Sequence, residues 1–303
     1  MSKTNSVTIG SYYPKEGALP VRMTNDLLFH YLLQDHDDED ILKGIISSFC
    51  NIPIEEIKSV VVQNPISYGE KLDSKTMVLD VKALLNDNRI INLEMQVINY
   101  NDWPERSISY ICRCFDNLLA GQGYLQVKGA FHIGFLDFTL FPDNAAFYTT
   151  YSMRDDKTNR LYSSKFGITV VDLTLIDNAT EDDKAHHRDL WASFFKAKTW
   201  EEIHMLATQD KNIERAAIKL YTLSEDQRIR DEIWAREDQL RRELDMKYSY
   251  EAAMEEKNQV IKIKDEIIRV AQEKAKVAQK ELKDKDDEIA ALRAKLAKLT
   301  DQT

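Results

Sequence analysis

The sequence predicts an α/β domain that is followed by further helices and then by a coiled coil. Short runs of β-branched residues, several with alternating polarity, indicate strands between residues 57 and 175. Apolar residues at intervals of three and four indicate amphipathic helices around these strands. Residues 225–303 contain neither glycine nor proline, and part of this segment has apolar residues every seven positions, which is typical of a coiled coil.

Composition restricts the class of protein. The chain has 303 residues, enough for about two domains, and its 43% hydrophobic and 30% charged residues suit a protein with a real core. We expect neither a secretion signal nor a membrane span, because no sufficiently long apolar run is present. Three cysteines form no disulfide framework and favour a cytoplasmic location. The net charge of −10 argues against a DNA-binding protein that neutralises phosphates without regard to sequence.

The first elements follow a polar N-terminal arm. Thr24 or Asn25 can cap a helix whose apolar residues have helical spacing. A second helix is expected over Glu39–Phe49, with its apolar residues on one side. The β-branched run Ile57–Val62 then predicts a strand.

Two alternating apolar runs surround the turn residues 86–88, and we interpret them as a β-hairpin. The first strand is expected over 77–85 and the second over 91–97. If residues 86–88 form a three-residue loop, Asp80 lies opposite Glu94, with their Cβ atoms about 4.5–5.5 Å apart. A two-residue loop would place the two carboxylates on opposite faces of the hairpin.

Two neighbouring carboxylates repel each other, so one must be protonated or a cation must lie between them. The hairpin therefore predicts a metal site at Asp80 and Glu94. The alternative is a buried salt bridge from these carboxylates to Lys82 or Arg106, because a buried carboxylate needs a partner.

The remaining elements are predicted from periodicity alone. A helix is expected from Pro104 to about Gly121, strands near 128–138, 145–153 and 167–175, and short helices over 183–223. The coiled-coil seam predicts a homo-oligomer, most simply a dimer, through residues 261–299, and the alternative is a single solvated helix. The seam positions are Ile261, Lys264, Ile268, Ala271, Ala275, Ala278, Leu282, Lys285, Ile289, Leu292, Leu296 and Leu299.

Several blocks of the sequence resemble the recombination-promoting nuclease/transposase family of the PD-(D/E)xK nuclease superfamily. In chain order they are NDLLFHYLL from Asn25, VLDVKA at 78–83, IINLEMQV at 90–97, WPERSISY at 103–110 and GFLDFTLF at 134–141. The resemblance covers about residues 20–178. It implies a restriction-endonuclease-like core with a mixed sheet flanked by helices. The expected parts are an arm (1–19), this core (20–178), a helical extension (179–224) and a long helix or coiled coil (225–303).

The resemblance also implies an activity, a cofactor and a set of site residues. The family's activity is metal-dependent hydrolysis of DNA, linked to recombination or mobile elements, with Mg²⁺ as the expected cofactor and Mn²⁺ as a substitute. Asp80 and Glu94 match the two metal-binding carboxylates, and Gln96 stands where the superfamily usually has lysine. Lys82, or Lys71 or Lys75 in the preceding loop, would then supply the missing positive charge. Asp26 is a further candidate ligand or supporting carboxylate.

Glutamine at position 96 leaves a second function open. Its amide can hydrogen-bond a water molecule, but it has neither a positive charge nor a proton equilibrium near neutral pH. The alternative to a nuclease is therefore a catalytically inactive nuclease-fold scaffold or DNA-binding protein that oligomerises through its coiled coil.

Overall fold

The computed structural model describes residues 16–34, 39–63, 66–67, 77–78 and 81–300. The chain forms two compact units, and the boundary between them lies after Gln239. Within the described ranges, no helix is both long enough and apolar enough to cross a membrane.

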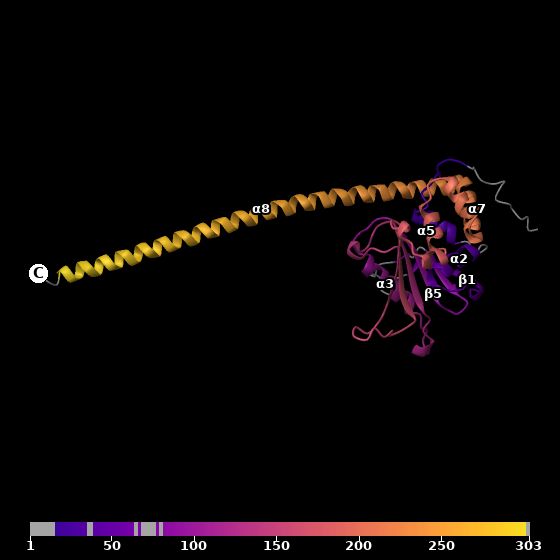
Figure 1. Ribbon diagram of the computed structural model, residues 1–303, viewed down its shortest axis with the longest axis horizontal. Helices are drawn as coiled ribbons and strands as arrows, with labels where there is room; N and C mark the ends of the chain where they lie inside the picture. The colour runs from indigo at the N-terminus through magenta and orange to yellow at the C-terminus, as the bar shows by residue number, and fades with distance from the viewer. Residues whose placement is uncertain (1–15, 35–38, 64–65, 68–76, 79–80, 301–303) are drawn as a thin grey trace, which may run out of the picture. The chain divides into compact units, whose positions relative to one another are not determined.

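A six-stranded mixed sheet forms the centre of the first unit, as Figure 1 shows. The strand order is β1-β4-β5-β6-β8-β7. The pairs β1–β4, β4–β5 and β7–β8 are antiparallel, whereas β5–β6 and β6–β8 are parallel. The strands are β1 (Val60–Gln63), β4 (Val81–Leu85), β5 (Ile90–Gln96), β6 (Ala130–Leu136), β7 (Tyr148–Ser152) and β8 (Phe166–Asp172).

Helices cover both faces of this sheet (Figure 1). On one face, Phe135 of β6 packs against Phe29, Phe49 and Phe195, which belong to α1 (Asp26–Leu33), α2 (Glu39–Cys50) and α5 (Arg188–Lys196). On the other face, α3 (Trp103–Phe115) packs across β5, β6 and β8. Successive side chains of a strand point to opposite faces, so the even-numbered residues of β5 and β6 face α3.

The predicted hairpin has the expected register. Leu85 donates its N–H to the carbonyl of Arg89 at 2.9 Å, and the ladder continues from Leu84–Ile90 to Val81–Leu93. Asn88 closes the three-residue loop with a φ of 66°, a left-handed conformation that asparagine tolerates better than most residues.

The structure describes two parts of the strand expected over 77–85, Met77–Val78 and Val81–Leu85, and they belong to different sheets. Met77–Val78 forms β3, which pairs with β2 (Ile66–Ser67) in a separate two-stranded sheet. The alternation of polarity could not show this difference in pairing, because it depends on the two faces of a strand and not on which partner the strand has.

The helix expected to reach Gly121 ends at Phe115. The side chain of Asn117 donates to the carbonyls of Cys114 and Lys128 and accepts from the N–H of Lys128. These bonds tie the end of α3 to the segment before β6, so the chain leaves the helix here. The other predicted strands and helices are present within a few residues. The remaining helices are α4 (Glu181–Ala185), α6 (Trp200–Ala207) and α7 (Lys211–Glu225), with 3₁₀ turns at Ile54–Glu56, Tyr124–Gln126, Pro142–Asn144 and Ile176–Asn178.

The long helix α8 runs from Gln227 to Thr300. Its first turns belong to the first unit, where Ile229 and Ile233 are buried. Within the second unit, apolar seam residues are exposed, including Leu282 and Leu292.

Candidate functional site

A buried polar cluster lies on the face of the sheet that α3 covers. Asn92 and Glu94 of β5 and His132 of β6 are each at most 1% exposed. The parallel register places Asn92 beside His132, and Glu94 beside Gly134. A Cβ atom at Gly134 would lie 2.0 Å from Cζ2 of Trp103. The glycine therefore lets the Trp103 indole lie against the strand next to Glu94.

Arg106 of α3 is the ion-pair partner of Glu94. Its Nε and Nη2 lie 2.8 Å and 2.7 Å from the same carboxylate oxygen, Oε1. The Arg106 side chain is 32% exposed, and its guanidinium stands over the Tyr110 ring. The pair therefore has one end in the core and one end in contact with solvent. Of the two partners that the sequence allowed for a structural salt bridge, Arg106 is the one that Glu94 has among the described residues.

His132 lies between Asn92 and Glu94, with one ring nitrogen facing each of them. Asn92 Nδ2 lies 2.7 Å from His132 Nδ1. An amide nitrogen only donates, so Nδ1 accepts and the imidazole proton is assigned to Nε2. This nitrogen faces Glu94 Oε2 at 3.7 Å, which is beyond hydrogen-bond distance.

Burial governs the protonation of both groups. Burial raises the pKa of Glu94 to about 7, although the charge and the hydrogen bond of Arg106 act in the opposite direction. Burial, together with the positive charge of Arg106, lowers the pKa of His132 to about 3. His132 is therefore neutral at neutral pH, and Glu94 is poised between its two protonation states.

Four buried polar atoms in this cluster have no hydrogen-bond partner within the described part of the chain. They are Asn92 Oδ1, Glu94 Oε2, His132 Nε2 and Trp103 Nε1. Buried polar atoms are rarely left unpaired, so their concentration around one carboxylate marks a place that a water molecule, a ligand or an ion can complete.

The donor set at Glu94 fits a hard divalent cation in part. Oxygen atoms are the ligands that Mg²⁺ prefers, and Glu94 Oε2 supplies one buried oxygen that Arg106 does not use. No group of three or more His, Cys, Asp or Glu side chains that could hold a metal occurs among the described residues. Asp80, Lys71 and Lys75 lie outside the described residues.

Lys82 and Gln96 flank Glu94 on the same face. Lys82 pairs with Asn92 across the hairpin, so its side chain lies on the same face of the sheet as Glu94. Gln96, at the end of β5, donates from Nε2 to the carbonyl of Ile98 at 2.9 Å.

Asp26 has a different environment. Arg236 of α8 lies with Nε 2.9 Å from each of its two carboxylate oxygens. The Leu27 N–H also donates to Asp26 Oδ1, and Asn25 caps the helix. These are the contacts of a charge at a helix N-terminus that anchors α8.

Sequence reasoning did not single out Asn92 or His132 as members of a site. The available signal was His132 itself, the one basic residue within the apolar run AFHIGFL. Its partners could not be read from the sequence, because they depend on the parallel pairing of β5 with β6.

The fold and the site together define a class of protein. A six-stranded mixed sheet flanked by helices, with the acidic residue Glu94 on a central strand, is consistent with the PD-(D/E)XK α/β fold. A family model described as PD-(D/E)XK nuclease family transposase matches residues 23–253, and the chain belongs to this family. No curated protein and no solved structure matches the chain significantly.

Proposed function

We propose that this protein is a metal-dependent endonuclease that hydrolyses phosphodiester bonds of DNA, with Mg²⁺ as its cofactor and Mn²⁺ as a substitute. The observation that carries the proposal is the oxygen Oε2 of Glu94, which is buried on β5 of a nuclease-family fold and has no hydrogen-bond partner among the described residues. The three free cysteines are compatible with a cytoplasmic protein.

Asp80 and Glu94 are the proposed metal ligands. Asp80 directly precedes Val81, whose partner Leu93 directly precedes Glu94. This place in the sequence, one position before the described pair Val81–Leu93, is why we assign Asp80 as the second carboxylate. When bound, the metal supplies charge stabilisation for the phosphate and lowers the pKa of the attacking water.

The remaining residues have positioning and electrostatic roles in this proposal. Gln96 orients the attacking water, because a carboxamide can hydrogen-bond water but cannot remove its proton at neutral pH. Lys82 places a positive charge on the face of Glu94, where it stabilises negative charge on the phosphate. Asp26 is only a supporting carboxylate, because Arg236 occupies both of its oxygens.

Plasmid cleavage with Mg²⁺, with Mn²⁺ and with EDTA tests the proposal. We expect metal-dependent cleavage by the wild-type protein, and its loss in both Asp80→Ala and Glu94→Gln. Glu105→Gln is the matched control, because Glu105 is an exposed acid next to Arg106 with no ion pair among the described residues. Cleavage that survives in both site variants, or is absent from the wild type, would overturn the proposal.

The second candidate is a nuclease-fold scaffold or DNA-binding protein without catalysis. The observation that favours it is the ion pair itself, because Arg106 already neutralises Glu94 without a metal. Calorimetric titration with Mn²⁺ distinguishes the two functions. A nuclease binds Mn²⁺ in a way that Glu94→Gln abolishes, whereas a scaffold shows no such binding.

We also propose that residues 261–299 join two copies of the chain in a coiled coil. Seam residues Ile261, Ile268, Leu282, Ile289 and Leu292 are each about half exposed or more. A second copy offers the same repeating apolar stripe, and packing the two stripes together removes both from water. The proposed dimer gives one assembly two nuclease sites.

A further inference from the structure

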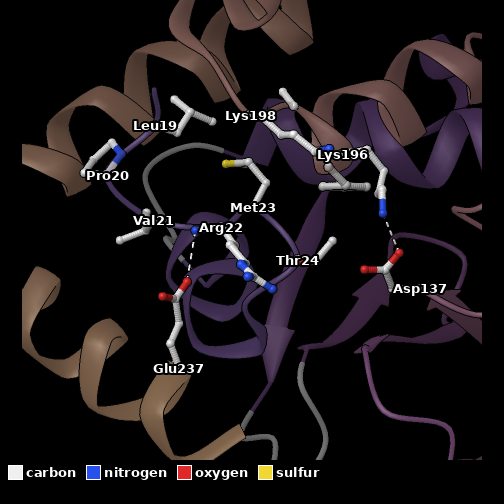
Figure 2. A pocket seen from close by; sticks show the side chains of 12 residues that line it. Leu19, Pro20, Val21, Arg22, Met23, Thr24, Asp137, Lys196, Lys198 and Glu237 are labelled. Atoms are coloured by element: carbon white, nitrogen blue, oxygen red, sulfur yellow. Dashed lines mark hydrogen bonds and ion pairs between the residues drawn. The ribbon is translucent and has the colours of Figure 1, made fainter. Parts of the chain in front are cut away.

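A pocket of about 430 Å³ lies in the first unit, outside the polar cluster around Glu94. Its walls come from residues 19–24, residues 195–198, Asp137 and Glu237. Figure 2 shows these groups around the hollow. The proposed nuclease site uses none of these residues.

The pocket lies at the carboxyl end of the parallel strands β5 and β6. Asp137 directly follows β6, and its N–H donates to the carbonyl of Gln96, the last residue of β5, at 2.9 Å. One hydrogen bond therefore connects the pocket wall to the strand that carries Glu94. Open α/β sheets commonly bind their ligands beyond the carboxyl ends of their strands.

Two of the three cations that line the pocket form no ion pair with the described residues. Lys196 and Asp137 neutralise each other at 2.5 Å, as Figure 2 shows. Glu237 accepts the backbone N–H of Arg22 at 3.1 Å. Within the described part of the chain, neither the Arg22 guanidinium nor the Lys198 ammonium forms an ion pair, and both side chains are exposed. The lining therefore has three cations (Arg22, Lys196 and Lys198) and two carboxylates (Asp137 and Glu237), an excess of one positive charge. In a chain with a net charge of −10, this local excess favours an anionic ligand.

Arg22 and Lys198 are held on a fixed frame. The Leu19 N–H donates to the carbonyl of Lys198 at 2.8 Å, and a β-bridge joins Ala18 to Thr199. The segment that carries Arg22 is thus fixed to the segment that carries Lys198. Val21 and Phe195 are buried beside them, which adds an apolar wall. Because these segments are already fixed, less conformational entropy is lost when a ligand binds.

We propose that this pocket binds one nucleotide unit of a DNA strand, with Arg22 and Lys198 holding its phosphate. Arginine forms paired hydrogen bonds to phosphate oxygens, and lysine adds a point charge. The apolar wall accommodates the sugar or the base, and the volume lies within the usual range for small-ligand sites. The proposal rests on the proposed function for the identity of the ligand, but the binding itself requires no cleavage.

Fluorescence anisotropy of a labelled oligothymidylate, in EDTA so that no cleavage occurs, measures this binding. The test variant is Arg22→Gln/Lys198→Gln. The matched control is Lys157→Gln/Lys211→Gln, which removes two exposed lysines that form no ion pair among the described residues. Thermal unfolding of each variant shows that the fold is retained.

The pocket variant is expected to bind about tenfold more weakly or worse, because each lost contact is a charge-assisted hydrogen bond. The slope of log K against log salt should fall by about 0.7, since the two cations together neutralise one phosphate of a single strand. Arg22→Lys should retain the wild-type slope, because the charge remains. The control variant should show smaller changes in both affinity and slope.

Three results would overturn the proposal: equal binding by the pocket and control variants, no binding by the wild type, or equally tight binding of the mononucleotide dTMP, which indicates a free-nucleotide site. The proposed function fails separately. If the wild-type protein does not cleave DNA but the pocket variant loses DNA binding, the result supports the pocket proposal and rules out the nuclease function. If cleavage requires Glu94 but the pocket variant binds DNA as the wild type does, only the pocket proposal fails.

Discussion

Arg106 holds one oxygen of Glu94 with two nitrogens and leaves the other oxygen without a hydrogen-bond partner among the described residues. In the proposed function, this division lets the same carboxylate serve two purposes. Oε1 stabilises the fold by pairing with α3, and Oε2 remains available for a cation. The ion pair and the proposed metal ligand are therefore compatible, although the charge of Arg106 weakens the attraction of Glu94 for a metal.

A double-mutant cycle measures the energy of this pair. Arg106→Gln leaves a buried carboxylate without its cation, and should cost about 2 kcal/mol, less than for a fully buried pair because Arg106 is partly exposed. Glu94→Gln/Arg106→Gln should recover part of this loss, giving a coupling of ~1 kcal/mol or more. Urea unfolding in EDTA at neutral pH gives the values. A control cycle that replaces Glu94→Gln by Glu105→Gln should show no coupling with Arg106→Gln. Equal coupling in both cycles would contradict the Glu94–Arg106 ion pair.

Gly134→Ala should destabilise the site by steric clash. The new methyl group would lie 2.0 Å from the Trp103 ring, so the indole or the strand must move, at a cost of about 3 kcal/mol. Thermal unfolding and the tryptophan emission spectrum should both change. Gly123→Ala is the control, because Gly123 has open space around its Cβ position and a φ of −82°. A Gly134→Ala protein as stable as the control would show that Trp103 does not pack there.

His132 should make the protein less stable in acid. Its folded-state pKa of about 3 lies below the ordinary value of 6.5, so the unfolded chain takes up the proton first. The contribution of neutral His132 to the free energy of unfolding is fully present above pH 6.5 and is lost as the pH falls towards 3.

In EDTA, His132→Gln should therefore lose less stability than the wild type as the pH falls through this window, by up to a few kcal/mol. Glu94 contributes in the opposite direction, because its raised pKa increases stability as the pH falls from 7 to 4.5. Both proteins retain Glu94, so its contribution largely cancels in the comparison. Urea midpoints measured across the window provide the test, with His186→Gln as control. Parallel pH profiles for wild type and His132→Gln would contradict the prediction.

The proposed dimer depends on the seam of α8 and not on exposed apolar residues in general. Leu282 lies on the seam and Val277 lies off it, yet their exposures are 63% and 59%. Leu282→Asn should weaken the dimer at least about tenfold in Kd, because burying a leucine contributes roughly 1.5–3 kcal/mol. Val277→Asn should have little effect. Light scattering at several concentrations of the full chain measures this. A monomeric wild type, or equal effects of the two variants, would rule out the seam as the contact.

Local signals predicted a large part of the fold correctly. The cap at Asn25 and the apolar spacing after it placed α1, and the alternation around residues 86–88 gave the β4–β5 register. Such features depend on residues close together in the chain. The end of α3 and the separate pairing of β3 were missed, because Asn117 bonds to Lys128 and β3 pairs with β2 instead of β5.

The sequence by itself determined the family, the polarity of the hairpin faces and the acidic residue at position 94. Only the tertiary structure decided what surrounds that residue: Arg106 from the next helix, His132 from the parallel strand β6, and Trp103 over Gly134. It also joined Asp26 to Arg236, two hundred and ten residues later in the chain. Side-chain periodicity reports which face of an element is buried. Which residues meet on that face depends on how separate elements pack, and that is settled only when the chain folds.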